Sequence, residues 1–253
     1  MKRLLLVSLS VFALTSGAAL AADIARKAPL AAPPPPSANW TGCYVDGGAG
    51  YGMWQQNHFI ETFPGLHQIF SAEDSNGRGW LGRFGGGCDY QFTLGTLGNF
   101  VIGALADYDF MSLKGFAADA SVGGETKESS AWGVGGRFGY LVTPSLLTYI
   151  NGGYSQTRFD RVDLFSTTLL TPLGFFIPAH TYRGWFFGGG TEYALTWLPI
   201  RGLFLRSEYR YASYQAADVP QLNSITGTPT GLSGEHIKNA VQTVTTALVW
   251  RFN

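Results

Sequence analysis

Alternating apolar and polar positions dominate the chain from Trp40 onward and indicate β-strands. In each candidate segment, aromatic and aliphatic residues share one side, and small or polar residues share the other. We predict eight strands, at residues 41–54, 78–92, 99–113, 129–142, 145–158, 183–197, 202–215 and 239–252. The periodicity therefore predicts an all-β protein.

The connections between these segments alternate in length. The long ones are residues 55–77, 114–128, 159–182 and 216–238, and the short ones are residues 93–98, 143–144 and 198–201. Long loops at one end and tight turns at the other are typical of an antiparallel up-and-down barrel in an outer membrane. We predict that residues 40–253 form an eight-stranded transmembrane barrel with four long external loops.

The charged residues of each segment lie opposite its aromatic residues. Asp107 and Asp109, for example, alternate with Tyr108 and Phe110. A soluble barrel would turn the rings inward, but the interior of eight strands is too narrow for so many rings. The rings are therefore expected to face lipid, and the charges to face the lumen. The predicted luminal charge network is Asp46, Arg83, Asp89, Asp107, Asp109, Arg137, Glu192, Arg206, Glu208 and Arg210.

Two functions are open for this network. Ions in a narrow, poorly hydrated interior must pair, because an unpaired buried charge is costly. The favoured interpretation is a plug of salt bridges that locks the barrel. The alternative is the lining of a narrow channel for small solutes, which the small bore of eight strands limits.

All seven tryptophans lie within a few residues of a predicted strand end. Amphipathic rings prefer the headgroup level of a membrane, so this placement predicts two aromatic girdles. The tryptophans are Trp40, Trp54, Trp80, Trp132, Trp185, Trp197 and Trp250.

The N-terminus has the pattern of a secretory signal peptide. Lys2 and Arg3 precede an uncharged apolar run, and Ala19-Leu20-Ala21 is a small-x-small cleavage site. We expect cleavage after Ala21, export, and residence in the cell outer membrane. Residues 22–39 contain a proline-rich stretch and are expected to form an extended linker.

Composition excludes several other classes of protein. Only 13% of the residues are charged, and the chain has 17 basic and 17 acidic residues. Loss of Lys2 and Arg3 leaves 15 basic residues, a net charge of −2, which argues against nucleic acid as a partner. The mature chain has no apolar run of 18 residues and therefore no predicted transmembrane helix.

The two cysteines are predicted to face each other in the first hairpin. If Trp54 pairs with Gly77, antiparallel counting also places Cys43 opposite Cys88. Cross-strand Cβ atoms lie roughly 4.5–5.5 Å apart, slightly more than the ideal of about 3.8 Å for a disulfide. We predict that the two cysteines lie close together. Whether they form a disulfide in the oxidising compartment is left open.

The sequence offers little for catalysis or for cofactors. The four histidines, His58, His67, His180 and His236, lie in the long loops or at their edges. A lipid-modifying Ser-His-acid site would need these loops to converge, and the spacing of His58 and His67 matches no compact zinc motif. We predict no enzyme activity, no cofactor and no metal site.

Aromatic residues in two of the long loops leave adhesion or ligand binding open as a third function. They are Phe59, Phe63, Phe70, Phe165, Phe175 and Phe176.

Four short motifs occur in order along the mature chain. The first, after the proline-rich stretch, is Asn39-Trp40-Thr41-Gly42-Cys43-Tyr44-Val45. The later ones are Gly190-Thr191-Glu192-Tyr193-Ala194, Arg206-Ser207-Glu208-Tyr209-Arg210-Tyr211 and Val249-Trp250-Arg251-Phe252. Together they resemble the small porin-family surface antigens of alphaproteobacteria, which are eight-stranded outer-membrane barrels related to the OmpA-like transmembrane barrel. The resemblance covers the mature chain in order and spacing.

The resemblance implies an abundant, non-catalytic surface protein that maintains outer-membrane integrity and presents its loops. Its implied partners are lipopolysaccharide, phospholipid and, through the C-terminal strand, the outer-membrane assembly machinery; the oligomeric state is not implied. The sequence departs from the family pattern in Cys43, where phenylalanine is usual, and in Phe252, which is penultimate. Thr245 and Val249 also replace the family's inward arginine and asparagine, so the luminal network is expected to differ.

Overall fold

The structure is a computed structural model that describes residues 38–62, 67–68, 72–119 and 122–252, without the side chains of 231–233. The predicted signal peptide and residues 22–37 of the linker lie outside this part of the chain. Apart from the 3-10 helix η1 (Gly95–Leu97), the regular elements of the described residues are strands. They are β1 (Gly42–Glu61), β2 (Glu73–Thr93), β3 (Asn99–Asp119), β4 (Val122–Thr143), β5 (Leu146–Phe159), β6 (Val162–Ser166), β7 (Pro172–Ile177), β8 (His180–Ala194), β9 (Leu203–Tyr214), β10 (Ala217–Asn223) and β11 (Pro229–Phe252).

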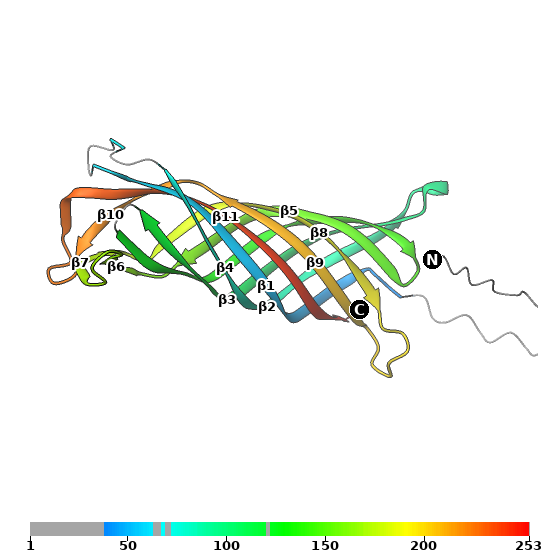
Figure 1. The fold of residues 1–253 in the computed structure, drawn as a ribbon. Helices are drawn as coiled ribbons and strands as arrows, with labels where there is room; N and C mark the ends of the chain where they lie inside the picture. Colours follow the sequence, from blue (N-terminus) through cyan, green and yellow to red (C-terminus); the bar gives the residue numbers. More distant parts are fainter. Residues whose placement is uncertain (1–37, 63–66, 69–71, 120–121, 253) are drawn as a thin grey trace, which may run out of the picture. The chain divides into compact units, whose positions relative to one another are not determined.

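The strands form one antiparallel sheet that closes on itself (Figure 1). Neighbours follow the order β1-β2-β3-β4-β5-β8-β9-β11, and β11 pairs again with β1 over 19 residue pairs. The short strands β6, β7 and β10 extend the sheet through the pairings β4–β6, β6–β7, β7–β10 and β10–β11. The predicted antiparallel all-β barrel is confirmed. The described residues form eleven strands rather than the eight predicted.

Two names are used below for the ends of the barrel. The loop end is where β6, β7 and β10 lie, and the turn end is where residues 94–98, 144–145 and 195–202 connect the strands. Among the described residues, no helix has the length and hydropathy needed to cross a membrane.

Five of the strands reach further into the loop end than the sequence predicted. β1, β2, β3, β4 and β11 continue by several residues into segments that were expected to be loops. Their outer faces there carry exposed polar residues, among them Asp74, Lys114 and Lys238. The sequence pattern did not predict these extensions. Backbone pairing continues beyond the point where the outer face stops being apolar, so the alternation of apolar and polar side chains that indicates a membrane-spanning strand is lost there.

The inside of the barrel contains an apolar cluster near each end. Trp40, Val101 and Phe204 belong to the cluster at the turn end. Trp54 and Leu113 belong to the larger cluster at the loop end. Trp40 and Trp54 are 0% and 1% exposed, so the prediction that they join the outer girdles is wrong.

Local hydrogen bonding and backbone space explain why these two rings turn inward. Trp40 Nε1 donates to the carbonyl oxygen of Pro144, and Trp54 Nε1 donates to that of Leu113 at 3.1 Å. The Trp54 ring also packs against the backbone of Gly77, where a Cβ atom would lie 2.3 Å from Cε2 of the indole. Glycine is therefore needed at that position for the ring to enter the barrel.

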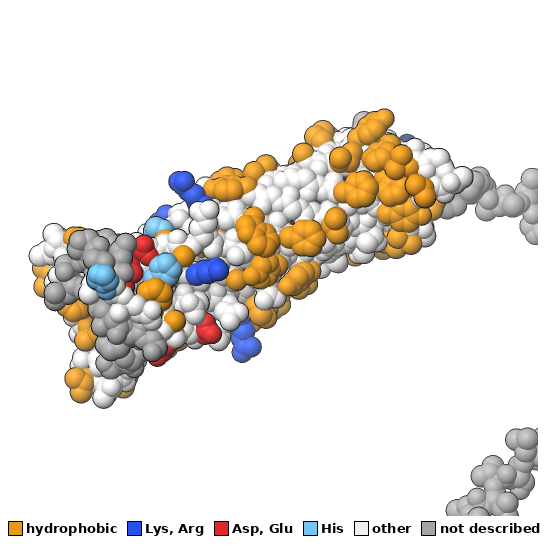
Figure 2. Space-filling view, turned by 90° about the horizontal axis from the view of Figure 1, so that it is seen from above, with side chains coloured by type: hydrophobic (Ala, Val, Ile, Leu, Met, Phe, Trp, Pro, Cys, Tyr) orange, Lys and Arg blue, Asp and Glu red, His pale blue; other side chains and the backbone are white. Residues whose placement is uncertain are grey.

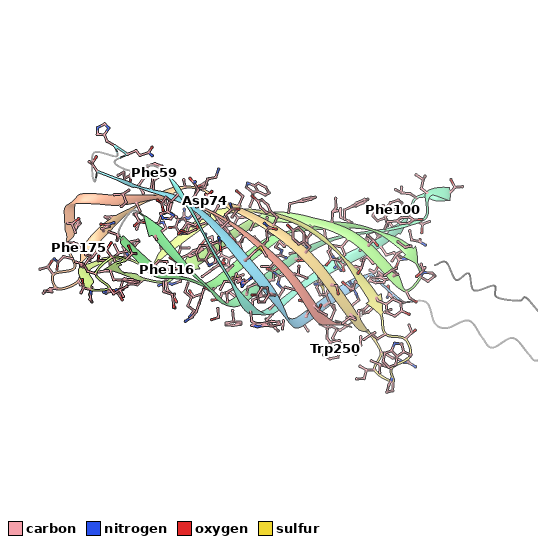
Figure 3. The ribbon with its side chains drawn as sticks, viewed as in Figure 1. Phe59, Asp74, Phe100, Phe116, Phe175 and Trp250 are labelled. Atoms are coloured by element: carbon pink, nitrogen blue, oxygen red, sulfur yellow. A yellow bond between two sulfur atoms is a disulfide. The ribbon has the colours of Figure 1, made fainter. Side chains whose placement is uncertain are left out.

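On the face shown in Figure 2, exposed hydrophobic side chains gather over the part of the barrel toward the turn end, and charged side chains and histidines lie toward the loop end. In Figure 3, Phe100 and Trp250 mark the turn-end half, whereas Phe59, Phe116 and Phe175 lie toward the loop end. Between these regions a row of exposed or half-buried rings crosses neighbouring strands, with the contacts Tyr51–Trp80, Trp132–Tyr154 and Trp185–Tyr211. This row separates the apolar band from the polar outer surface.

Candidate functional site

The charged residues predicted for the lumen project into the barrel and form two groups. Nine of the ten are buried, and Asp107 is half-buried with only 8% of its side chain exposed. They come from strands on all sides of the barrel, because the alternation of side chains turns every second residue inward. Each of the six acidic members contacts at least one arginine.

Glu192 is the centre of the group nearer the turn end. Its carboxylate contacts three guanidinium groups: Arg251 at 2.7 Å, Arg206 at 2.9 Å and Arg137 at 3.0 Å. Asp89 contacts both Arg137 and Arg251. Charge-assisted bonds of this kind are among the stronger hydrogen bonds in proteins. The group therefore cross-links β2, β4, β8, β9 and β11 through the lumen.

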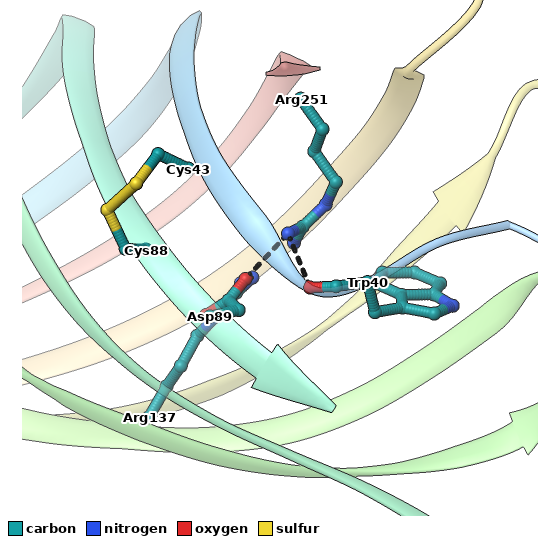
Figure 4. The surroundings of a disulfide bond; sticks show 6 residues. All are labelled: Trp40, Cys43, Cys88, Asp89, Arg137 and Arg251. Atoms are coloured by element: carbon teal, nitrogen blue, oxygen red, sulfur yellow. Dashed lines mark hydrogen bonds and ion pairs between the residues drawn. A yellow bond between two sulfur atoms is a disulfide. The ribbon is translucent and has the colours of Figure 1, made fainter. Parts of the chain in front are cut away.

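Tyr44 and Trp40 bring aromatic rings into the same group. The Tyr44 ring centroid lies 4.7 to 4.9 Å from the Cζ atoms of Arg137, Arg206 and Arg251, within range of cation–π attraction. The Arg251 guanidinium also donates to the carbonyl oxygen of Trp40 at 3.2 Å (Figure 4). The turn-end cluster and the charges are thus joined directly.

Glu208 is the centre of the group nearer the loop end. It accepts from Arg83 and Arg210 at 2.9 Å, from the Tyr149 hydroxyl at 2.8 Å and from Asn151 at 2.7 Å. Arg83 and Arg210 in turn form bidentate ion pairs with acidic residues of β3. These are Arg83–Asp109, with both bonds at 2.7 Å, and Arg210–Asp107, with bonds at 2.7 and 2.8 Å.

The space left between these side chains is small. A cavity of about 10 Å³ lies among Asp46, Arg83, Asp107, Arg206 and Glu208. A volume of that size holds about one water molecule. The ion pairs thus fill the middle of the barrel, between the two apolar clusters.

Sequence reasoning missed several members of this interior. Arg251 has the same parity as Thr245 and Val249, which face inward, so its direction was readable. Glu128 was assigned to a loop, although it is fully buried in β4 and accepts a 2.6 Å hydrogen bond from Thr157. Tyr44, Tyr149 and Asn151 carried no charge, and no signal in the sequence separated them from ordinary strand residues.

The two cysteines lie on the outer face of the first hairpin, at the turn end. The β1–β2 register pairs Cys43 with Cys88 and Trp54 with Gly77, the same register that the sequence predicted. A disulfide joins Cys43 to Cys88 in the structure (Figure 4). The covalent link therefore connects β1 to β2 beside the charged group around Asp89.

The other five tryptophans lie on the outside, as a girdle requires. Trp80 and Trp197 are each 72% exposed, and Trp132, Trp185 and Trp250 are exposed as well. Trp80, Trp132 and Trp185 belong to the row of rings that ends the apolar band. Trp197 and Trp250 lie toward the turn end.

The four histidines occupy different environments. His58 is buried inside the barrel, His67 is exposed, and His180 and His236 are half-buried. Burial lowers the pKa of His180.

Of the six loop phenylalanines, Phe63 and Phe70 lie outside the described residues. Phe59 packs on His236, Phe165 packs on Phe116, and Phe176 lies under the guanidinium of Arg161. Among the four that are described, Phe175 alone is exposed.

Comparison with known proteins gives a family match and several similar folds. A family model for the outer membrane protein beta-barrel domain matches residues 9–252. Neisserial surface protein A is 16% identical, with 84% of this chain and 98% of that chain covered and a TM-score of 0.40. OprG from Pseudomonas aeruginosa is 10% identical, with 85% and 99% covered and a TM-score of 0.45. The Escherichia coli outer membrane protease OmpT is 10% identical, with 83% and 97% covered and a TM-score of 0.44.

No curated protein sequence matches this chain. The family match extends over nearly the whole sequence and agrees with the closed antiparallel sheet. The chain therefore belongs to the outer membrane protein β-barrel domain family and is a protein of the outer membrane.

Proposed function

We propose that the protein is a structural barrel of the outer membrane, with eight membrane-spanning strands and no open channel. The spanning strands are β1, β2, β3, β4, β5, β8, β9 and β11, which carry the apolar outer band. The loop end faces the outside of the cell, and the five exposed tryptophans lie at the two membrane interfaces. In this position the protein contacts lipopolysaccharide and phospholipid and presents its loops.

The filled lumen is the observation that carries this proposal. A pore needs a continuous polar path, whereas here arginine–carboxylate pairs cross the middle of the barrel and apolar clusters lie near both ends. Opening such a path would separate buried ion pairs, which costs several kcal/mol for each charge left alone. The arrangement favours a rigid plug over a channel.

Planar-bilayer recording tests the proposal against the channel alternative. The mature protein, refolded and inserted, is expected to give no discrete conductance steps, while a known porin in the same bilayers gives them. Heat-modifiable gel migration of the same sample shows that the barrel is folded. Reproducible steps from folded protein would favour the narrow channel.

Adhesion is a second candidate, supported by the loop-end surface. Leu169, Leu170 and Ile225 are exposed at 74%, 76% and 94%, respectively. Leu170 also has a φ of 54°, a conformation in which a non-glycine residue is uncommon. Such a position is typical of functional segments.

Whole-cell attachment assays can test this second role. Changing these three residues to serine should reduce attachment without altering the amount of folded barrel in the outer membrane. Equal attachment by the variant cells would exclude these side chains as an adhesion surface.

The N-terminal predictions extend the proposal to export and assembly. The signal peptide is removed after Ala21, and the C-terminal strand is recognised by the assembly machinery. The mass of the purified protein checks the first point, because the mature chain should begin at Ala22.

A further inference from the structure

Three side chains with metal-binding atoms converge on the outer side of the sheet at the loop end; Glu61 is buried, His236 is half-buried and Asp218 is exposed. The register pairs Phe59 of β1 with His236 of β11, and His236 with Asp218 of β10. Glu61 follows Phe59 by two residues, so it is a diagonal neighbour of His236. The cluster therefore joins the two strands that close the barrel, β1 and β11, to the short strand β10.

The donor atoms are close enough to share one ion. One ligand atom from each of Glu61, Asp218 and His236 lies within 4.8 Å of the others. His236 Nδ1 and Asp218 Oδ1 are 2.5 Å apart. Two donors on one zinc ion are about 3 to 4 Å apart, given bond lengths of about 2.0–2.2 Å. Small side-chain movements would therefore bring all three into one coordination sphere.

The orientation of the imidazole is already restricted. The Phe59 ring stacks on the His236 ring with centroids 4.8 Å apart and an interplanar angle of 16°. Stacking limits the rotation of the imidazole, which reduces the conformational cost of binding an ion.

Glu61 supplies a second, independent indication that a ligand belongs here. Glu61 is only 2% exposed. Its Oε1 atom is buried and has no hydrogen-bond partner among the described residues. No arginine or lysine of the described residues forms an ion pair with Glu61, in contrast to the acids of the luminal network. A buried carboxylate without a partner is costly unless a cation or proton compensates it.

We propose that Glu61, Asp218 and His236 form a binding site for a divalent transition-metal ion of the zinc class. An imidazole with two carboxylates is a donor set that such ions accept, and three protein ligands leave further positions for water or an external ligand. A bound ion ties β10 to the β1–β11 seam, so the site would hold one external segment against the barrel wall.

Isothermal titration of the refolded mature protein in detergent with Zn²⁺ tests the site. The expected result is saturable binding of one ion per chain. His236→Gln, Glu61→Gln and Asp218→Asn should each weaken binding at least tenfold, because each removes one of three ligands. Two matched controls, His180→Gln and Asp163→Asn, change a histidine and an acid elsewhere at the loop end and should bind as the unchanged protein does.

Co²⁺ absorption provides a second readout of the same site. The visible bands of the bound ion should appear with the unchanged protein and both controls, and should be lost in His236→Gln. Heat-modifiable migration verifies that each variant is folded; if Glu61→Gln does not fold, the other two variants decide. Absence of saturable binding, or equal affinity in His236→Gln and Asp218→Asn, would overturn the proposal. These outcomes are independent of the conductance test, so the two proposals fail separately.

Discussion

The lumen and the outer surface of this barrel both contain acidic residues, but the two environments differ in solvent exposure and in the number of charged partners. Glu192 is fully buried and contacts three arginines. Glu125, on the outside at the loop end, forms an ion pair with Lys114 at 2.9 Å, and more than half of each side chain is exposed to solvent. Water screens the outer pair, whereas the inner charges depend on one another. The same residue type is therefore expected to matter greatly in one place and little in the other.

Replacing Glu192 should produce the largest loss of stability. Glu192→Ala leaves three guanidinium groups facing a vacated site inside the barrel, and removing one partner of a buried ion pair costs about 3–5 kcal/mol. Urea unfolding in lipid vesicles, followed by tryptophan fluorescence, would measure the change in the free energy of unfolding. Arg137→Ala should act in the same direction.

The matched control is Glu125→Ala, which breaks the exposed pair with Lys114 and should cost no more than about 1 kcal/mol. Equal unfolding midpoints for Glu192→Ala, Arg137→Ala and the unchanged protein would contradict the salt-bridge plug.

The two kinds of tryptophan provide a second contrast. Trp54→Ala removes a ring packed inside the loop-end cluster and should cost about 3–5 kcal/mol. Trp80→Ala removes a ring that is 72% exposed on the outer face, where lipid can fill the space, so its cost should be smaller. The same unfolding measurement compares them, and a larger loss for Trp80→Ala would reverse the assignment of inner and outer rings.

Glu61 should give the smallest effect, and one of opposite sign. Its pKa is raised above the ordinary value of 4.5, so between the two values the folded state binds more protons than the unfolded state. Stability from this group therefore decreases as pH rises through that window, and the charged carboxylate is a cost at neutral pH. In chelator-treated buffer, Glu61→Gln should slightly raise the unfolding midpoint at pH 7.5.

Acidic conditions and zinc supply the controls for that measurement. The advantage of Glu61→Gln should vanish well below pH 4.5, where both states are protonated. With zinc present at pH 7.5, Glu61→Gln should instead have a lower unfolding midpoint than the unchanged protein, because only the unchanged protein keeps all three ligands. A variant that is less stable than the unchanged protein without metal would argue that Glu61 has a partner that stabilises its charge.

The sequence predictions that succeeded used patterns of residues that lie close together along the chain. The alternation of apolar and polar residues predicted the inward direction of Asp89 and Glu208, because successive side chains of a strand point to opposite faces. Counting along the first hairpin gave the pairing of Cys43 with Cys88. Both patterns depend on residues near one another in the sequence, so contacts with distant parts of the chain do not alter them.

The errors have two different causes. Trp40 and Trp54 have the same parity as Tyr44 and Asp46, which face inward, so the alternation already indicated their direction and the prediction of a girdle went against it. Gly77 leaves room for the Trp54 ring, and the Pro144 carbonyl accepts the Trp40 N–H. Glu128, in contrast, belongs to a strand because β5 pairs with it beyond the apolar band, and no local pattern contains that contact.

The sequence alone determined the class of the fold, the two faces of the eight predicted strands and the order of those eight in the barrel, since these depend on the alternation of side chains and on loop length. It did not predict the short strands β6, β7 and β10. Only the tertiary structure decided which charges meet. Glu192 gathers arginines from three strands, whereas Glu61 meets Asp218 and His236. Closure of the sheet sets these partnerships, because the stagger between strands fixes which inward or outward side chains reach the same level.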